Sequence, residues 1–528
     1  MSKRPNILFL LSDEHSFRFF SHLDRSQGGE NVATPALDRL AAQSTVFTDC
    51  CCAAPLCVPS RITMLTGLEM QRSGGWDNDA YLDPTLPTMP KIMRGAGYAT
   101  CLVGKMHFRG TTQFHGFEHR PYGDLAGNVS HQYEYYIPLK ADDPVYGGDP
   151  DKPRSTGDYV EVRTRDAGVT RIPESQIVDQ IIAEETLAWL REHEAASPDK
   201  PWFLTASFSR PHFPLTSPQR FIDRYSPNEI SEPFAPAAGD TFDHPVSAAI
   251  REGFKVGRID HDEMMRGRAA YFANVAYLDE ILGDCLLRLE AAGLLDNTII
   301  IYASDHGEMA GELGSWWKSA WYEACARVPL FISTPEQRQG KQPARRIDVP
   351  VSLLDLLPTI AGLGGAATGD VSGIDLGSVI KGESEPPDRP IVCDHLNDRW
   401  GAGTAFRMVR KGPYKLTCFQ NYPPLFINLT DDPKEQHNLF ESARGDAATV
   451  RDELMKFVED TVDYDAVLAH SAASQAKLKA DYKLDNARYL PNQYMLSSGR
   501  IVEADVAVYK QDVITDDPAS FFADWPAT

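Results

Sequence analysis

The chain has 528 residues, of which 42% are hydrophobic and 24% charged, a composition typical of a soluble globular protein. The formal net charge of −22, from 74 acidic and 52 basic residues, disfavours nucleic acid or an anionic membrane as a general partner. An anionic substrate would therefore need a local cluster of cationic side chains, and no stretch is long and apolar enough to span a bilayer.

The start of the chain and its cysteines together predict a reduced, cytoplasmic protein. The first apolar run, in NILFLLSDEH, is brief and ends at Asp13 and Glu14 without a small-residue cleavage site, so we expect a strand and not a signal peptide. The nine cysteines are an odd number and show no zinc-ligand spacing.

Four apolar runs that we predict to be strands are each followed by side chains able to do chemistry. In chain order these strand ends carry Asp13 and Glu14, then Lys105 and His107, then Arg210 and His212, and last Asp305, His306 and Glu308. Continuous apolar runs fit strands buried on both faces of a largely parallel sheet. Functional crevices in such sheets lie beyond the carboxyl ends of the strands, so we expect these side chains to meet there.

Helical patterns alternate with these strands. Thr34 and Pro35 are a suitable N-cap and first helical residue for PALDRLAAQ. A second predicted helix ends at Gly293 and carries an apolar stripe of Val275, Leu278, Leu282, Leu286 and Leu289. The alternation predicts an α/β fold in which a large, mostly parallel sheet is sandwiched by helices.

Between the first two of these strands lies AAPLCVPSRITMLTG, in which Cys57 precedes a predicted helix and Arg61 follows one turn later. The first N–H groups of that helix would point towards an anion held near Cys57. The residues alone leave two interpretations of Cys57 open: a small buried hydrophobe, or a thiolate activated by Arg61 and the helix end. We assign the former role to Cys50, Cys51, Cys52, Cys101 and Cys285.

The motif CVPSR resembles the signature of the type I sulfatases in the alkaline phosphatase superfamily, in which the cysteine is oxidised to formylglycine. Further segments that resemble this family extend from Pro5 to about Leu439, among them NILFLLSDE, LPTMPKIMRGAGYATCLVGKMHF and NTIIIYASDHGEMAGELGSWWKSAW. GKMHFRGTTQFHGFEHR and SWWKSAWYEACARVPL are closest to bacterial choline-sulfatase-like enzymes. However, YGDLAGNVSHQYEYY lacks an obvious aromatic cage for a quaternary ammonium group.

The resemblance and a polar break at ESEPPDRP together predict three parts. Residues 1–385 would be the catalytic domain, and residues 386–462 a smaller α+β subdomain whose antiparallel sheet has a hairpin turn at Lys411 and Gly412. The aromatic-rich tail, residues 463–528, is expected to pack on its own or a neighbouring subunit, and we expect a homo-oligomer.

The resemblance also implies a metal site and a set of catalytic residues. The implied ligands are Asp13, Glu14, oxidised Cys57, Asp305 and His306, although Glu14 stands where family members often carry Asp. An oxygen-rich set with one histidine favours Ca²⁺ over Mg²⁺ or Mn²⁺. The implied catalytic residues are Cys57, Arg61, Lys105, His107, His212 and Lys318.

Each of these residues has an expected role by resemblance. Arg61 would hold the formylglycine hydrate, and Lys105 with Lys318 would clamp sulfate oxygens. His212 would protonate the departing alcohol, and His107 would take a proton when sulfate is expelled. Substrate contacts are expected from Lys105, His212, Lys318, Asn78 and His395, with Asn397 near the rim. The alternatives are a turn residue for Asn78, a surface lysine for Lys318 and a polar loop pair for His395 and Asn397.

The function that these features predict is hydrolysis of a small-molecule or carbohydrate sulfate monoester to an alcohol and inorganic sulfate. A formylglycine-generating enzyme would be the maturation partner. One alternative is a phosphonate monoester or phosphodiester hydrolase, which shares the formylglycine and metal core but tends to have Tyr and Thr where Lys105 and His107 stand. Another is a catalytically inactive binding protein with the same fold, which the complete set of site residues disfavours.

Overall fold

The computed structural model describes residues 4–21, 23, 28–109, 112–123, 164, 167–170, 173–482, 493–495 and 501–503. Over these residues no helix combines the length and the apolar character needed to cross a membrane. All nine cysteines are buried free thiols, which agrees with the expectation for Cys50, Cys51, Cys52, Cys101 and Cys285.

A nine-stranded mixed sheet forms the centre of the molecule, with strand order β10-β2-β9-β8-β1-β6-β3-β4 and β11 paired to β2. Only β9 runs antiparallel to its neighbours β8 and β2, so the predicted large and mostly parallel sheet is confirmed. The strands are β1 (Asn6–Asp13), β2 (Thr45–Cys51), β3 (Ala99–Gly104), β4 (His119–Gly123), β6 (Trp202–Pro211), β8 (Thr298–Ser304), β9 (Arg327–Ser333), β10 (Arg345–Ile347) and β11 (Val351–Ser352).

The three central strands bring the polar residues that follow them to the same end of the sheet. Every residue of β1, β6 and β8 is buried, as expected for strands covered on both faces. Leu8 of β1 pairs with Leu204 of β6 and with Ile300 of β8. Because the three strands are parallel, Asp13 and the residues that follow β6 and β8 emerge at the same end of the sheet.

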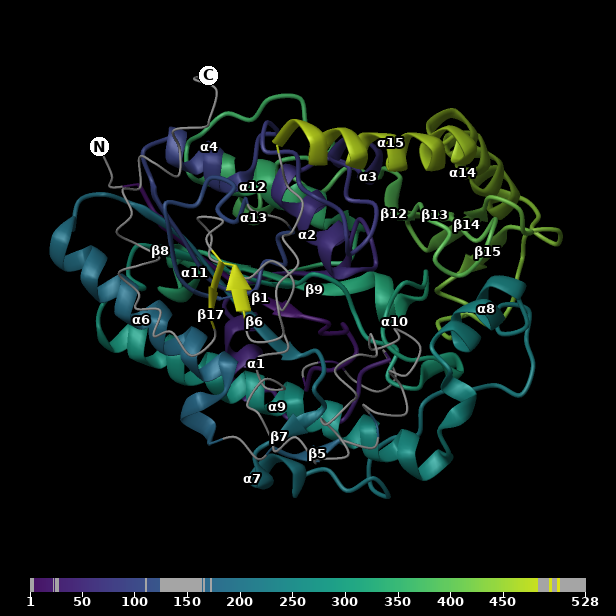
Figure 1. Cartoon of the computed structure of the whole chain (residues 1–528), viewed down its shortest axis with the longest axis horizontal. Helices are drawn as coiled ribbons and strands as arrows, with labels where there is room; N and C mark the ends of the chain where they lie inside the picture. The colour runs from purple at the N-terminus through teal and green to yellow at the C-terminus, as the bar shows by residue number, and fades with distance from the viewer. Residues whose placement is uncertain are drawn as a thin grey trace.

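Helices cover both faces of this sheet (Figure 1). One face carries α1 (Pro35–Ala41), α6 (Val178–Ala196) and α9 (His261–Ala291), and the other carries α2 (Cys57–Thr66), α4 (Met89–Gly95), α12 (Leu356–Leu363) and α13 (Gly377–Lys381). The apolar stripe predicted before β8 lies on α9, and Gly293 follows its end with φ +71°.

The capping of α1 differs from the prediction. Thr34 occupies the N-cap position, but its hydroxyl makes no capping hydrogen bond. Instead, the carboxylate of Asp279 on α9 accepts hydrogen bonds from the backbone N–H groups of Ala36 at 3.0 Å and Leu37 at 2.8 Å. The acceptor for the start of α1 therefore comes from a distant helix, which a local pattern cannot reveal.

The C-terminal antiparallel sheet has the order β12-β13-β14-β15. Its strands are β12 (Ile391–His395), β13 (Phe406–Lys411), β14 (Tyr414–Phe419) and β15 (Leu425–Asn428). The expected hairpin joins β13 to β14 through Gly412, whose φ is +51°. Helix α14 (Asp446–Thr461) packs on β14, and Leu454 of α14 joins a second apolar core with Val409, Leu416 and Phe426.

A buried ionic cluster joins this sheet to the part of the chain that holds the nine-stranded sheet. Arg410 of β13 donates to Glu323 at 2.7 Å and to Asp49 of β2 at 2.5 Å. Lys415 of β14 donates to Glu323 at 3.0 Å and to Glu435 at 2.6 Å. Glu323, the first residue of α10 (Glu323–Ala326), is thus shared by two cations from the smaller sheet.

The remaining described elements are short or peripheral, apart from helix α15 (Tyr464–Tyr482). The short helices are α3 (Met70–Ser73), α7 (Gln219–Ile222), α8 (Pro245–Gly253), α11 (Pro335–Arg338), η3 (Glu174–Gln176), η4 (Val256–Arg258), η5 (Glu312–Gly314) and η6 (Leu353–Asp355). Two small sheets pair β5 (Gly168–Val169) with β7 (Thr216–Ser217) and β16 (Gln493–Met495) with β17 (Ile501–Glu503). Most of the aromatic tail predicted to pack on a subunit lies outside the described residues, as does YGDLAGNVSHQYEYY beyond Gly123.

Candidate functional site

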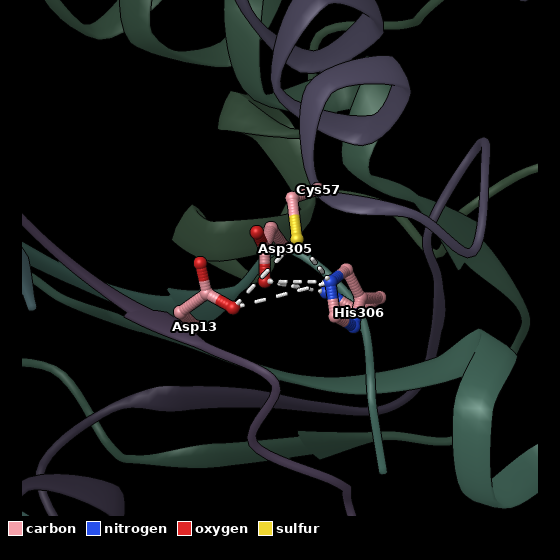
Figure 2. A group of neighbouring side chains, drawn as sticks. All are labelled: Asp13, Cys57, Asp305 and His306. Atoms are coloured by element: carbon pink, nitrogen blue, oxygen red, sulfur yellow. Dashed lines mark hydrogen bonds and ion pairs between the residues drawn. The ribbon is translucent and has the colours of Figure 1, made fainter. Parts of the chain in front are cut away.

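Four buried side chains meet where β1 and β8 end and α2 begins (Figure 2). We call this group the ligand cluster: Asp13, Cys57, Asp305 and His306. One potential ligand atom from each residue lies within 4.8 Å of the others. The Sγ of Cys57 is 3.2 Å from Nε2 of His306 and 4.0 Å from Oδ1 of Asp13. The structure therefore brings Cys57 to the strand ends that the sequence singled out.

Cys57 is the first residue of α2, and the cap of this helix is supplied from a loop. Leu56 occupies the N-cap position and has no polar side chain to accept from the first turn. The side-chain oxygen of Asn78 accepts from the backbone N–H of Val58 at 3.0 Å. Asn78 was predicted as a substrate contact, and the structure gives its carbonyl oxygen this capping contact.

Arg61 lies one turn after Cys57 and orients both aspartates. Its guanidinium donates to Oδ2 of Asp13 and to Oδ2 of Asp305, each at 2.8 Å. It also donates to the backbone oxygen of Lys105 at 2.7 Å and to Oγ of Ser207 at 3.0 Å. The Oδ1 atoms of the two aspartates lie 4.0 and 3.8 Å from Nε2 of His306, on the side of the ligand cluster.

Two lysines bring positive charge to the cluster. Lys105 forms an ion pair with Oδ2 of Asp13, and Lys318 donates to Oε2 of Glu14 at 3.1 Å. Burial alone would raise the pKa of Asp13, but the charges of Lys105, Arg61 and Lys318 hold it well below its usual value. Asp13 is therefore a carboxylate, and the local charge opposes the acidic balance of the whole chain.

Glu14 also belongs to a neighbouring group of side chains. Its Oε2 lies 3.2 Å from Nε2 of His212 as well as near Lys318, and Asp13, Glu14 and His212 form a second set of possible metal ligands. Burial raises the pKa of Glu14 well above its usual value, because Lys318 offsets only part of the loss of hydration. Its other oxygen, Oε1, is buried and accepts no hydrogen bond from an N–H donor of the described residues, and the carboxyl of Glu308 lies beside Glu14.

The two predicted proton-transfer histidines are both buried. Nδ1 of His212 lies 2.8 Å from the carbonyl oxygen of Phe213; a carbonyl can only accept, so Nδ1 carries the hydrogen and Nε2 faces Glu14. Burial, with the charges of Lys318 and Lys105, lowers the pKa of His212 well below its usual value. Burial and the same Lys105 charge lower the pKa of His107.

The unmodified thiol of Cys57 is protonated at neutral pH. Burial, followed by the charge of Asp13, raises its pKa to about 11. Because this pKa lies well above neutral pH, a free thiolate nucleophile is disfavoured in the chain as it is translated. For Lys318, burial would lower the pKa, but the groups around it, Cys57, Glu14 and Asp13, raise it instead.

His395 and Asn397 lie in the C-terminal sheet and the loop after it. The His395 ring is 1% exposed and stacks on Phe406 with a centroid distance of 5.3 Å. Neither ring nitrogen has a hydrogen-bond partner elsewhere in the described chain. Asn397 donates to the backbone oxygen of Trp76 at 2.8 Å. Both residues have structural contacts here, and a role in substrate binding stays a prediction.

Two supporting residues were given no role in the prediction from the sequence. Oε1 of Glu308 accepts from the N–H groups of Ala310 at 2.7 Å and Trp317 at 2.6 Å, which fixes the segment that leads to Lys318. Glu308 stands two residues after His306, at a strand end that the sequence analysis had already named. Ser207 lies inside β6 and bonds Arg61, and no local signal marks it, because this contact exists only in the folded sheet.

Comparisons with known proteins give a consistent group of relatives. A sequence model described as Sulfatase matches residues 5–366. Choline-sulfatase of Rhizobium meliloti is 32% identical over 465 residues, which are 85% of this chain and 85% of the relative. Arylsulfatase of Clostridium perfringens is 28% identical over 450 residues, 83% of this chain and 91% of the relative.

Solved structures share the fold at lower identity. The phosphonate monoester hydrolase of Silicibacter pomeroyi aligns with a TM-score of 0.70 and 23% identity, over 87% of this chain and 96% of that chain. The protein BT4656, solved with its substrate D-glucosamine-2-N,6-O-disulfate, aligns with a TM-score of 0.66 and 22% identity, over 92% and 100% of the two chains.

Proposed function

The chain belongs to the sulfatase family and is a sulfuric ester hydrolase, and we propose that Cys57, after oxidation to formylglycine, is its nucleophile. The observation that carries this proposal is the place of Cys57, with Sγ 3.2 Å from Nε2 of His306 at the ends of β1 and β8. In the translated chain this sulfur stands in for an oxygen of the formylglycine hydrate. The CVPSR motif supports the oxidation, because it carries the resemblance to the family.

The ligand cluster has the donor set of a hard divalent cation. Nδ1 of His306 lies 3.0 Å from the carbonyl oxygen of Gly307, so Nδ1 carries the hydrogen and the Nε2 lone pair faces Cys57. Arg61 occupies Oδ2 of both aspartates, which leaves their Oδ1 atoms on the cluster side. We propose Asp13, oxidised Cys57, Asp305 and His306 as ligands, and Glu14 through its buried Oε1 as a further oxygen donor.

We propose Ca²⁺ as the ion, ahead of Mg²⁺ and Mn²⁺, because three carboxylates with one imidazole suit a hard and adaptable cation. When bound, such an ion would neutralise sulfate oxygens and polarise the S–O bond. Lys105 and Lys318 would hold the remaining oxygens, which is the arrangement that an anionic substrate needs in a chain of net charge −22. Arg61 acts on the aspartates and would hold the hydrate beside them.

Two histidines would move the protons of the reaction. We assign His212 Nε2 the proton that the alcohol takes when its bond to sulfur breaks, and His107 the proton released from residue 57 when sulfate leaves. In sum, one sulfate ester and one water give one alcohol, one sulfate and one proton. The negative charge of a bound sulfate would offset Lys318 and Lys105, the charges that keep the His212 pKa low.

We propose a small organic or carbohydrate sulfate ester as the substrate. Aromatic rings gather beside Lys318: its Nζ lies 5.5 Å from the ring centroid of Phe213, and Trp317 lies 5.7 Å from Phe213 and 5.0 Å from Phe254 between ring centroids. Aromatic faces bind quaternary ammonium groups. Choline sulfate is the first substrate to test, because the relative named choline-sulfatase matches 85% of this chain.

The kinetic test compares sulfate esters with a phosphonate monoester, using protein in which conversion of Cys57 is verified by peptide mass. The panel contains choline sulfate, an alkyl sulfate, an aryl sulfate and a glucosamine 6-sulfate. We expect the best sulfate ester to exceed the phosphonate in kcat/KM, and Cys57→Ala to lose nearly all turnover. A faster phosphonate, or unchanged turnover of Cys57→Ala, would refute the assignment. Chelation followed by addition of Ca²⁺, Mg²⁺ or Mn²⁺ separately identifies the ion.

We further propose the setting of this reaction. A formylglycine-generating enzyme would oxidise Cys57 before the ligand cluster closes around it, since the residue is only 1% exposed in the folded chain. The nine free thiols support a reduced, cytoplasmic location. We also propose that residues 1–385 form the catalytic domain, residues 386–462 a subdomain and residues 463–528 a tail, and that the protein assembles as a homo-oligomer.

A further inference from the structure

Helix α15, which is far from α2 in the sequence, contacts a loop that lies beside α2, the helix that begins with Cys57. We call residues 74–81 the Asn78 loop. Oε1 of Gln475 accepts from the backbone N–H of Tyr81 at 2.8 Å, and Nε2 of Gln475 donates to the carbonyl oxygen of Gly74 at 3.2 Å. One half-buried amide on α15 thus holds both ends of the loop together. In Figure 1, α15 lies beside α3, the short helix that leads into the loop.

Two further contacts fix the middle of the loop. The indole N–H of Trp76 donates to Oγ of Ser474 at 3.2 Å, and the carbonyl of Trp76 accepts from Asn397 at 2.8 Å. The Trp76 side chain is 3% exposed and belongs to the core of the C-terminal subdomain. The Asn78 loop is therefore anchored by segments far from it in sequence.

The other side of the loop rests on α2. A Cβ added to Gly75 would lie 3.2 Å from Cα of Pro59 and 3.3 Å from Cβ of Ile62, so the loop backbone touches the helix directly. From the same loop, Asn78 caps α2 through Val58, the residue after Cys57. Any shift of the loop would move Asn78 and loosen the first turn that carries Cys57.

We propose that Gln475 is a positioning residue for the reaction: it closes the Asn78 loop so that Asn78 stays on the N-terminus of α2 and Cys57 keeps its place. The proposal rests on the proposed function, in which Cys57 is the nucleophile. Because Gln475 acts only through the loop, replacing Gln475 should not lower kcat/KM further once Asn78 has been replaced.

A double-mutant cycle tests this dependence in converted full-length enzyme. Gln475→Ala is expected to lower kcat/KM for the best sulfate ester about tenfold, because small misplacements of reacting groups carry large rate penalties. Asn78→Ala is expected to lower kcat/KM at least as much, and the double variant no further than Asn78→Ala alone. Gln475→Glu keeps an acceptor for Tyr81 but loses the donor to Gly74, so it should recover part of the loss.

Hydrogen exchange supplies a readout that does not depend on turnover. Gln475→Ala should speed exchange at the amides of Tyr81 and Val58, whereas Lys477→Ala, on an exposed position of the same helix, should change neither exchange nor kcat/KM. The proposal is overturned if Gln475→Ala lowers kcat/KM by the same factor with and without Asn78, or changes neither rate nor exchange. If the proposed function itself were wrong, this would be seen separately, because the Cys57→Ala variant would keep its activity.

Discussion

At the scale of single residues, Arg61 connects both aspartates of the ligand cluster to the strands around them. Its guanidinium is 1% exposed and divides its donors between Asp13 and Asp305, with two more bonds to Lys105 and Ser207. Only a planar, multi-donor group can satisfy these acceptors at once, and a lysine ammonium in its place would reach fewer of them.

Arg61→Lys should therefore lower kcat/KM by about 100-fold or more, since Asp13 and Asp305, two of the proposed metal ligands, would lose a fixed orientation. Conversion of Cys57 is checked by peptide mass, so that failed maturation is separated from failed catalysis. The matched control is Arg72→Lys, at an exposed ion pair with Asp370, which should leave kcat/KM unchanged. A converted Arg61→Lys enzyme with normal kcat/KM would contradict the role given to Arg61.

Most members of the site could be predicted because each follows a recognisable apolar strand or lies in CVPSR. The contacts among them could not, since Glu14 paired with Lys318 and Asn78 on the first turn of α2 depend on residues that are distant in sequence. The stack of the His395 ring on Phe406 likewise depends on the folded sheet, and the substrate contact expected of His395 stays a prediction.

At the scale of secondary structure elements, the strands β1, β3, β6 and β8 were predictable because burial on both faces leaves a continuous apolar run. The direction of β9 was not, because an antiparallel strand at this place is defined by pairing with β2 and β8 and not by its own residues. The capping contact of α1 could not be predicted for the same reason, because its acceptor, Asp279, lies on α9.

Asp279 gives this capping contact a pH signature. Burial raises its pKa to about 6, although the hydrogen bonds from Ala36 and Leu37 act in the other direction. An unfolded aspartate titrates near 3.9, so between about pH 4 and pH 6 the folded chain binds more protons than the unfolded chain. The contribution of Asp279 to stability must therefore fall as the pH rises through this window and level off above it.

Asp279→Asn removes this titration. The difference in unfolding free energy, wild type minus Asp279→Asn, should decrease from pH 4 to pH 6 and then stay constant, as measured by urea denaturation at each pH. Asp284→Asn, on an exposed position of the same helix, is the control. A difference for Asp279→Asn that does not change with pH, or that rises, would show that the carboxyl does not carry a raised pKa.

At the scale of the whole molecule, buried charges attach the smaller sheet to the nine-stranded sheet. Lys415 is fully buried between Glu323 and Glu435, and Arg410 neutralises Glu323 from the other side. The burial of such a cluster is favourable only while every charge keeps its partners. The same charges also tie β2, through Asp49, to β13.

Lys415→Met keeps the volume and removes the charge, which leaves two buried glutamates without their shared cation. The expected loss is about 3–5 kcal/mol in unfolding free energy, measured by urea denaturation. Adding Glu435→Gln should restore part of it, because the second carboxylate then no longer needs the lysine. Lys411→Met, whose partner Glu453 is half exposed, should have little effect. If Lys415→Met were no worse than Lys411→Met, the cluster would not join the two sheets energetically, and the apolar contacts around them would carry that attachment.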